Sequence, residues 1–434
     1  MSARDTALSA LIACRRQHAW SDGVLKEYTA RDRLDRRDAA LASRLCYGVL
    51  QNRMLLDEWL SRFVKGRLRD LQPVVLDILR LGAYQLTMMD KIPPSAAVNE
   101  AVGQTRRLAN GKAANLVNAV LRNMDRSRVK LTLPEDLSVR YSHPPQLVAL
   151  LAESLPPEKL EPFLACDNQA PATYVQVNTL RATEAAVCSA LEHEGYQCRS
   201  HLWMADCLQI MGGSIDQSRP FAEGQVYAQD PAAKLAALCA GLEPGMRVLD
   251  CCSAPGGKSF AAAIAMEDKG QIVSCDIHPH KIALIEKGAR RLGLQCIRPM
   301  LADATQYRPD WAAAFDVVLA DAPCSGLGVI RKKPDIRYRE LSQTEALPAL
   351  QKKILDNQAR YVRPGGTLMY STCTVLRREN EAVAEAFLQT HPDFAPAPLA
   401  LPASMGEDQC GRKTLLPCDD DADGFFLCRF RRKL

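Results

Sequence analysis

The first 130 residues repeat apolar side chains at the three- and four-residue spacing of amphipathic helices. One apolar stripe covers residues 55–63, another residues 74–79, and a third residues 113–124. The arginines beside the third stripe, including Arg122 and Arg126, fall on the opposite side of the predicted helix. We therefore predict an all-helical segment with a core built from the stripes and a basic outer surface.

The helical pattern breaks at residues 131–134 and gives way to a mixed pattern. Apolar and polar positions alternate at residues 174–177, an apolar run covers residues 207–211, and residues 183–193 between them suit a helix. This order of elements predicts a small βαβ-type unit within residues 174–230.

From about residue 231 onward, short β-rich runs alternate with segments that suit helices. The predicted strands cover residues 246–250, 272–276, 296–301, 316–321, 367–371 and 424–430. Such alternation is typical of an α/β domain with a doubly wound, mostly parallel sheet. We thus divide the chain into a helical domain at residues 1–130, a linker and small α+β subdomain at residues 131–230, and the α/β domain at residues 231–434.

Composition narrows the class of protein. The 434 residues are 47% hydrophobic and 24% charged, as in ordinary folded proteins. No apolar run approaches the roughly 18 residues that cross a membrane, and the N-terminus carries no secretory signal pattern. We expect a cytoplasmic protein with no membrane partner.

The net charge of +5 is unevenly distributed. Residues 1–140 hold 24 Lys and Arg against 15 Asp and Glu, whereas the remainder holds 31 against 35. A basic helical part beside a slightly acidic remainder suggests a module that binds a polyanion. A solvated helical surface that is merely rich in arginine is the alternative that charge leaves open.

Sixteen cysteines are spread over the whole length of the chain without any C-x-x-C pair. The spacing of zinc ligands is therefore absent, and we expect no metal. In a cytoplasmic protein most of these thiols are expected to be reduced and buried as small apolar side chains.

A glycine pair follows the predicted strand at residues 246–250. Gly256 and Gly257 precede a helix, where they let a ligand approach the backbone closely, although a plain turn would use them too. The pattern is neither that of a P-loop nor that of a dinucleotide-binding loop. Asp276 ends the next strand and Asp303 follows the one after, which places them for ribose hydroxyls and a purine amino group. Recognition of a nucleoside without phosphate points to S-adenosylmethionine, whose cationic sulfonium suits an acidic site.

Two cysteines stand at the ends of two other predicted strands. Cys324 follows the strand at residues 316–321, and Cys373 follows the strand at residues 367–371. Ligands of doubly wound sheets bind at the carboxyl ends of the strands, so both thiols are expected beside the nucleoside loop. A thiolate that adds to carbon 6 of cytosine makes carbon 5 nucleophilic toward a methyl donor. Asp321 is then a candidate for stabilising charge on the ring and Cys324 for assisting release, while the spacing leaves open which cysteine attacks.

The motifs around these residues resemble those of the RNA cytosine-C5 methyltransferases, the Nol1/Nop2/Sun family. They are Asp250-Cys-Cys-Ser-Ala-Pro-Gly-Gly-Lys258, Asp321-Ala-Pro-Cys324-Ser-Gly and Tyr370-Ser-Thr-Cys373-Thr. Residues 328–337, 415–417 and 423–426 look like the bacterial branch, and residues 98–102 and 115–123 resemble the helical domain related to the antitermination factor NusB. The resemblance covers nearly the whole chain. It implies a Rossmann-like class I methyltransferase domain preceded by an all-α NusB-like domain and the small α+β subdomain.

The resemblance also implies roles for individual residues. Cys373 is the expected nucleophile, Cys324 assists product release, and Asp321 is catalytic. The expected binding site for S-adenosyl-L-methionine consists of Cys252, Ser253, Ala254, Pro255, Gly256, Gly257, Lys258, Asp276, Asp303 and Asp321. DNA cytosine methyltransferases use the Pro-Cys thiol as nucleophile instead, so the assignment of the two thiols rests on the family resemblance.

The implied substrate is 16S rRNA, either naked or within an early assembly intermediate, with no obligate protein partner. The basic N-terminal helices and the run Arg331-Lys332-Lys333, with Arg337 and Arg339 beyond it, are expected to contact the RNA backbone. A tRNA or large-subunit rRNA enzyme with the same chemistry is one alternative. A NusB-like RNA-binding protein with an inactive methyltransferase domain is another, and the intact cysteine pair argues against it.

Overall fold

A computed structural model describes residues 1–17, 19–408 and 410–434 of the chain. These residues fold into two compact units. The first, which we call the helical unit, comprises Met1–Ala152, Pro156–Gln169 and Ile330–Arg339. The second, the sheet unit, comprises Glu153–Leu155, Ala170–Val329 and Glu340–Leu434. The division into segments 1–130, 131–230 and 231–434 stays a prediction, which limited proteolysis can test.

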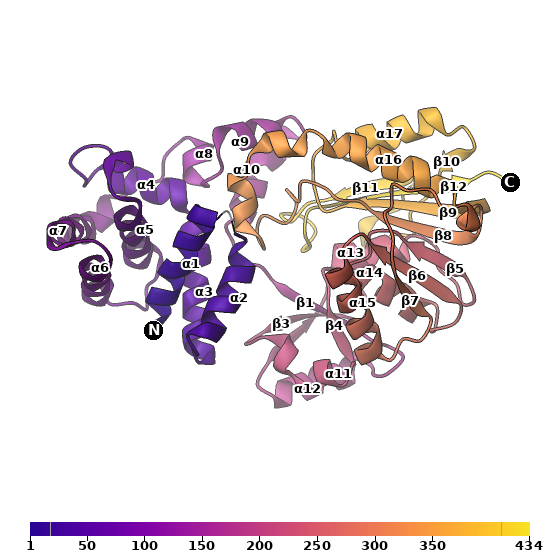
Figure 1. Cartoon of the computed structure of the whole chain (residues 1–434), viewed down its shortest axis with the longest axis horizontal. Coiled ribbons are helices and arrows are strands. Elements are labelled where there is room, and N and C mark those ends of the chain that lie inside the picture. Colours follow the sequence, from indigo (N-terminus) through magenta and orange to yellow (C-terminus); the bar gives the residue numbers. More distant parts are fainter. Residues whose placement is uncertain (18, 409) are drawn as a thin grey trace. The chain divides into compact units, whose positions relative to one another are not determined.

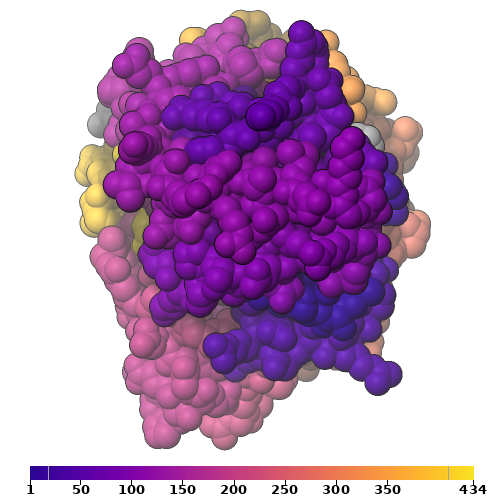
Figure 2. Space-filling model, turned by 90° about the vertical axis from the view of Figure 1, so that its left-hand side faces the viewer, coloured from indigo at the N-terminus to yellow at the C-terminus, as the bar shows by residue number. Residues whose placement is uncertain are grey.

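Amphipathic helices build the helical unit, as the apolar stripes predict. They are α1 Ala3–Gln17, α2 Ser21–Arg31, α3 Arg36–Gln51, α4 Arg53–Ser61, α5 Pro73–Met88, α6 Pro94–Leu108, α7 Gly111–Ser127, α8 Leu137–Arg140, α9 Pro145–Ala152 and α10 Pro157–Cys166. Helix α7 begins where the Asn110 side chain accepts a hydrogen bond from the amide of Ala113. Its apolar face is buried with Leu56 and Ile78 from α4 and α5, whereas Arg122 is exposed. Figure 2 faces this unit, and its purple helices form one continuous surface.

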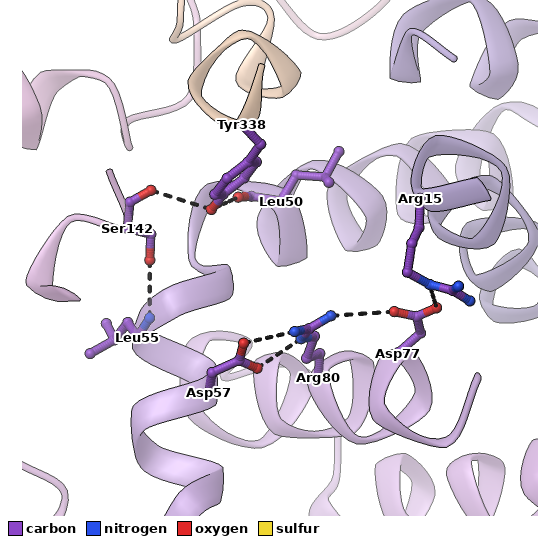
Figure 3. A network of polar contacts seen from close by, with 8 residues as sticks. All are labelled: Arg15, Leu50, Leu55, Asp57, Asp77, Arg80, Ser142 and Tyr338. Atoms are coloured by element: carbon purple, nitrogen blue, oxygen red, sulfur yellow. Dashed lines mark hydrogen bonds and ion pairs between the residues drawn. The ribbon is translucent and has the colours of Figure 1, made fainter. Parts of the chain in front are cut away.

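A short segment distant in sequence completes the helical unit. It contains the 3₁₀ turn η5, Pro334–Tyr338. The hydroxyl of Tyr338 donates to the carbonyl of Leu50 at 2.8 Å and lies 3.3 Å from the carbonyl oxygen of Ser142 (Figure 3). The hydroxyl of Ser142 in turn accepts a hydrogen bond from the amide of Leu55. The buried guanidinium of Arg337 donates to the carbonyl of Gln51 at 2.9 Å. These bonds satisfy carbonyls at the end of α3, which the helix itself leaves unpaired.

The burial of this segment corrects one prediction. Arg331 and Arg337 are both buried, so RNA contacts by these two residues are wrong. Exposed Lys333 and Arg339 lie over the ring of Trp20, at 5.6 and 3.3 Å from its centroid. The charge pattern misleads here because a buried arginine that donates to backbone carbonyls has the same sequence signature as one that faces RNA.

An ion-pair chain joins three helices of the same unit (Figure 3). Arg80 donates to both carboxylate oxygens of Asp57 at 2.7 Å, and Asp77 accepts from Arg15 at 2.9 Å and from Arg80 at 3.4 Å. The bidentate geometry makes the Arg80–Asp57 pair the strongest of these contacts. It fixes α4 against α5.

The sheet unit starts with a small antiparallel sheet. Its elements are β1 Thr173–Val177, α11 Glu184–His193, β2 Gln197–Ser200, β3 Cys207–Met211, α12 Arg219–Ala222 and β4 Val226–Ala228. The strand order is β2-β3-β1-β4, and every pair is antiparallel. The subdomain is thus α+β, as predicted, but the βαβ-type unit is wrong because β1 and β3 run in opposite directions. The edge strand β2 escapes prediction since its polar side chains show no apolar alternation.

A larger, mostly parallel sheet follows. Its elements are α13 Pro231–Leu238, β5 Arg247–Asp250, α14 Gly257–Ala265, β6 Gln271–Asp276, α15 Pro279–Leu292, β7 Ile297–Leu301, β8 Phe315–Asp321, α16 Leu347–Ala359, β9 Val362–Thr372, α17 Glu381–Thr390, β10 Phe394–Pro396, β11 Arg412–Leu415 and β12 Phe425–Arg432. The strand order is β10-β12-β9-β8-β5-β6-β7, and β11 pairs with β12. Strands β5 to β9 pair in parallel, whereas β10, β11 and β12 pair antiparallel. The predicted α/β class and the predicted strands are confirmed.

Helices cover both faces of this sheet, with α16 and α17 on one face and α13, α14 and α15 on the other (Figure 1). Alternate residues of each parallel strand pack on opposite faces, as Val248 and Leu249 do in β5. Both faces are buried, which explains why the strands read as continuous apolar runs. The carboxyl ends of β5 to β9 therefore lie along one edge of a rigid layer.

Candidate active site

The strand order of the sheet places the predicted site residues side by side along one edge. Asp276 ends β6, Asp250 ends β5, and Asp321 ends β8. Asp303 follows β7 on one side, and Cys373 follows β9 on the other. Because neighbouring strands lie roughly 5 Å apart, the three steps from β6 to β9 span about 14 Å. The edge is long enough to seat two adjoining ligands.

Gly256 and Gly257 form a turn between β5 and α14 in which side chains do not fit. Gly256 has φ of 113°, and a Cβ there would meet the ring of Phe260 at 2.4 Å. A Cβ on Gly257 would lie 2.9 Å from Nε2 of Gln229. The presence of glycine at both positions thus has a steric basis.

The rest of the glycine loop is tied to the neighbouring strand. The amide of Ser253 donates to the carbonyl of Cys275 at 2.8 Å, and its hydroxyl lies 3.2 Å from the same oxygen. Cys252, Ala254 and Pro255 belong to the same turn. These contacts fix the loop between β5 and β6.

An ion pair stands between the glycine loop and the cysteines. Nζ of Lys258, in the first turn of α14, lies 2.6 Å from Oδ2 of Asp321, and the hydroxyl of Ser371 donates to Oδ1 of Asp321 at 2.8 Å. The Lys258 side chain is 10% exposed and that of Asp321 is 28% exposed. The lysine of this pair is therefore shielded from solvent, whereas the carboxylate is partly exposed to it.

Asp250 is a fully buried carboxyl group directly beneath the glycine loop. Burial raises its pKa to about 7, although a hydrogen bond from Ser259 and the charge of Lys258 oppose the shift. The sequence gives only its place at the end of a strand. Its altered titration was not foreseeable, because burial depends on the packing of α14.

The two acidic residues predicted for the nucleoside lie at the carboxyl ends of adjacent strands, Asp276 as the last residue of β6 and Asp303 two residues beyond β7. The carboxylate of Asp276 accepts from the amide of His278 at 3.0 Å, and Asp303 accepts from the amide and hydroxyl of Thr305 at 2.8 Å. Ile277 directly follows Asp276 and is 55% exposed. An exposed apolar side chain at this position suits packing against the face of a base. The sequence could have indicated Ile277, because it directly follows a carboxylate at the end of a strand.

The two cysteine thiols meet. Sγ of Cys324 lies 3.2 Å from Sγ of Cys373, although 49 residues separate them in the sequence. The loops that carry them are further joined by a hydrogen bond between the hydroxyls of Ser325 and Thr374 at 2.8 Å. The pairing follows from the parallel contact of β8 with β9, where Asp321 is the partner of Ser371.

The contact with Cys373 changes the titration of Cys324. The hydrogen bond between the two thiols, together with burial, raises the pKa of Cys324 well above that of a free thiol. Cys324 accordingly resists ionisation, and either sulfur can be the donor in the hydrogen bond. Spacing in the sequence carries no information about this contact.

Two glycines outside the predicted site hold the Cys373 loop. The amide of Gly328 donates to the Cys373 carbonyl at 3.0 Å, and the amide of Gly424 donates to the Gly328 carbonyl at 2.8 Å. A Cβ on Gly328 would lie 1.9 Å from the Gly424 carbonyl oxygen. Both positions fall in motifs that resemble the family, but their contacts with the Cys373 loop are seen only in the structure.

Two features are absent from residues 1–17, 19–408 and 410–434. No group of three or more His, Cys, Asp or Glu side chains could hold a metal ion in this part of the chain. None of its helices is both long and apolar enough to cross a membrane.

Three family models match the chain. The model described as 16S rRNA methyltransferase RsmB/F covers residues 237–431, and that of the NusB family covers residues 1–126. A model described as a ferredoxin-like domain of RsmF/B-like methyltransferases covers residues 143–214. These matches confirm the resemblances found for the catalytic motifs and for the N-terminal helices.

Among solved structures, the chain is similar to PH0851, with a TM-score of 0.80 at 24% identity over 98% of each chain. It is also similar to NSun6 from Pyrococcus horikoshii, with a TM-score of 0.60 at 19% identity over 67% of this chain and 98% of that one. At these identities the likeness establishes the fold alone.

Curated relatives match over the full length. The probable ribosomal RNA small subunit methyltransferase B of Bacillus subtilis is 37% identical over 100% of this chain and 99% of its own length. The ribosomal RNA small subunit methyltransferase B of Vibrio cholerae is 34% identical over 92% and 90%. With this identity and coverage, and with the strand-end cysteines and glycine loop in place, the chain belongs to the RsmB/F family of 16S rRNA methyltransferases.

Proposed function

We propose that this protein methylates carbon 5 of a specific cytosine in 16S rRNA, through a covalent bond between Cys373 and carbon 6 of the base. The observation that carries the proposal is the pair of thiols at the ends of β8 and β9, 3.2 Å apart. Methyl transfer to a nitrogen or an oxygen needs no thiol nucleophile. Carbon 5 of cytosine does, because it is a poor nucleophile until carbon 6 is substituted.

The residues along the edge fit S-adenosylmethionine as the donor. Gly256 and Gly257 present only backbone at the start of α14, and the carboxylate of Asp276 suits ribose hydroxyls. Ile277 offers an apolar surface for the adenine, and Asp303 suits its amino group. When bound, this donor supplies an electrophilic methyl group on a cationic sulfonium.

The thiol pair suits nucleophilic attack by Cys373. Cys324 keeps its proton and donates a hydrogen bond, which stabilises negative charge on the Cys373 sulfur. The Cys373 thiolate adds to carbon 6, and the electron pair of the ring's 5,6 double bond becomes available for carbon 5 to take the methyl group. The Lys258–Asp321 pair holds a proton next to the ring, where it stabilises the charge that the addition creates.

The same pair of thiols serves the last step. Once the Cys373 sulfur is bonded to carbon, it carries no negative charge that would oppose ionisation of Cys324. Cys324 can then give its proton to solvent and, as a thiolate, take the proton on carbon 5. The electrons of that C–H bond restore the 5,6 double bond, and Cys373 leaves as a thiolate. Each cysteine thus acts in a different step.

The helical unit supplies exposed cations for the RNA. Arg106, Arg107, Lys112 and Arg122 all lie on its surface in α6 and α7. Such residues bind phosphates and provide affinity rather than base recognition. The target cytosine has to leave its stack before a pocket can enclose it, so we propose a single-stranded or flipped base in naked 16S rRNA or an early assembly intermediate in the cytoplasm.

The proposal is tested with purified protein, labelled S-adenosylmethionine and unmodified 16S rRNA. We expect label on one cytosine, located by mass spectrometry of nuclease fragments, and no transfer to mature small subunits. Label on transfer RNA or large-subunit rRNA alone would overturn the substrate, and label away from carbon 5 would overturn the chemistry. RNA binding without any transfer would support an inactive binding protein instead.

A further inference from the structure

Asn380 stands at the start of α17 but does not cap this helix. Asparagine at an N-cap position ordinarily accepts a hydrogen bond from an amide of the first turn, which stabilises the helix. The Asn380 side chain makes no such bond. It is fully buried, so its contacts must be made elsewhere.

The Asn380 side chain instead joins the two residues that flank Cys373. Its Oδ1 accepts from the hydroxyl of Thr372 at 2.6 Å, and its Nδ2 donates to the carbonyl of Thr374 at 2.9 Å. Thr372 and Thr374 are themselves fully buried. The side-chain amide of Asn380 therefore holds both neighbours of Cys373, Thr372 through its hydroxyl and Thr374 through its backbone carbonyl.

Glu379 makes the corresponding contacts around Cys324. Its Oε2 accepts from the amide of Ser325 at 2.9 Å and from Nε2 of Gln351 at 2.9 Å. The same Gln351 nitrogen donates to the carbonyl of Pro323 at 2.9 Å. Glu379 thus holds both neighbours of Cys324, one directly and one through Gln351.

The carboxyl group of Glu379 is buried with few hydrogen-bond partners among the described residues. The carboxyl group is fully buried, and both of its donors are neutral. Its second oxygen, Oε1, has no hydrogen-bond partner among the described residues. Burying a carboxylate with so few partners is expensive, and such costs are characteristic of functional positions.

We propose that Glu379 and Asn380 are positioning residues of the reaction, with Glu379 setting the Cys324 loop and Asn380 setting the Cys373 loop. The inference rests on the proposed function and adds to it a division of labour between two consecutive residues. The charge of Glu379 also disfavours a second negative charge on Cys324, which helps raise the pKa of that thiol. Glu379 in this way supports the assignment of the proton to Cys324.

The test compares variants in two backgrounds. In otherwise wild-type protein, Asn380→Ala should slow formation of the covalent RNA adduct at least tenfold, and Glu379→Ala should let the adduct accumulate on denaturing gels. In the Cys324→Ala background, Glu379→Ala should have no further effect on the rate of adduct formation, since the residue it positions is gone. Asn380→Ala should still slow that rate at least tenfold.

Either of two results would overturn the inference. One is slower adduct formation in the double variant Glu379→Ala/Cys324→Ala than in Cys324→Ala alone. The other is a normal rate of adduct formation in Asn380→Ala protein. Failure of the proposed function is distinguishable, since Cys324→Ala alone would then form no adduct with RNA. Glu385→Gln, on the exposed side of α17, is the matched control and should behave as wild type.

A second measurement is made without RNA, on a variant that retains the hydrogen-bond acceptor at residue 379. Glu379→Gln keeps an acceptor for Ser325 but removes the charge. Only the thiolate reacts with iodoacetamide, so Cys324 should be alkylated at least threefold faster at pH 8 in this variant, as read by peptide mapping. An unchanged Cys324 rate would contradict the electrostatic part of the inference. An equal increase at Cys198, a thiol distant in sequence, would indicate general loosening and would contradict it too.

Discussion

The ammonium group of Lys258 lies 2.6 Å from the carboxylate of Asp321, although 63 residues separate them in the sequence. This pair connects the glycine loop after β5 with the Pro-Cys loop after β8. It joins the two halves of the candidate site, with the glycine loop on one side and the thiols on the other. Its removal should affect both stability and chemistry.

We expect Lys258→Met to lower the free energy of unfolding by about 2 kcal/mol and the rate of methyl transfer by tenfold or more. The estimate is below the range for fully buried pairs because the Asp321 side chain is partly exposed. Urea denaturation and a transfer assay measure the two effects. Lys269→Met is the control, since the exposed Lys269–Glu267 pair should contribute almost nothing.

Asp250 should make the stability of the sheet unit depend on pH. Its pKa is about 7 in the folded chain and close to 4 when unfolded. Below pH 4 both states are protonated, whereas between pH 4 and 7 only the unfolded state ionises, so stability falls as pH rises. Asp250→Asn should remove this fall, on the order of 4 kcal/mol. Urea denaturation from pH 4.5 to 8 measures it, and parallel curves for the two proteins would contradict the assignment.

The contact between Gly328 and Gly424 should not tolerate a methyl group. A Cβ on Gly424 would lie 2.7 Å from the Gly328 Cα, so Gly424→Ala must push the Gly328 amide away from the Cys373 carbonyl. We expect a loss of about 2 kcal/mol in stability and a larger proportional loss in transfer rate. Gly23→Ala, in α2 with open space around it, should leave the transfer rate unchanged and should not lower stability, because alanine favours a helix over glycine.

The two cysteines should give opposite results on a denaturing gel. Cys373→Ala should abolish methyl transfer and form no adduct, whereas Cys324→Ala should add to the RNA and fail to release it. In the mechanism we propose, Cys373 forms the bond to carbon 6 and Cys324 assists its cleavage. An adduct in Cys373→Ala protein would reverse the two roles.

Arg337 should matter for folding and not for RNA. Arg337→Met leaves its acceptors unpaired, including the Gln51 carbonyl and the Asn168 side chain, and should cost about 3 kcal/mol. The slope of RNA affinity against salt should not change. Arg122→Ala, at an exposed position, should lower that slope by about 0.7 while leaving stability intact. A weaker dependence of RNA affinity on salt in Arg337→Met protein would instead support the predicted contact between Arg337 and RNA.

Periodicity and strand-end position were sufficient to predict much of this fold. The parallel strands are long apolar runs between helices, and their ends carry Asp250, Asp276 and Asp321. Since sheet ligands bind at strand ends, these positions identify candidate residues without any coordinates. The antiparallel pairing of β1 with β3 escaped prediction because an apolar run carries no direction.

The contacts that tune the site were beyond prediction for a different reason. Glu379 and Asn380 read as an ordinary polar start of a helix, and their bonds to the cysteine loops depend on how α16, α17 and β9 pack. Arg337 likewise reads as a surface cation. In each case burial decides the role of a polar side chain, and burial is a property of the assembled layers.

The segment Ile330–Arg339 completes the helical unit late in synthesis. A chain leaving the ribosome presents α1 to α10 long before this segment has been made, and domains ordinarily fold as they emerge. Until it arrives, the carbonyls of Leu50 and Gln51 have only water to bond with. The helical unit therefore cannot reach its final packing cotranslationally from its own N-terminal stretch, and a fragment that ends at Gln169 is an incomplete protein rather than a free-standing module.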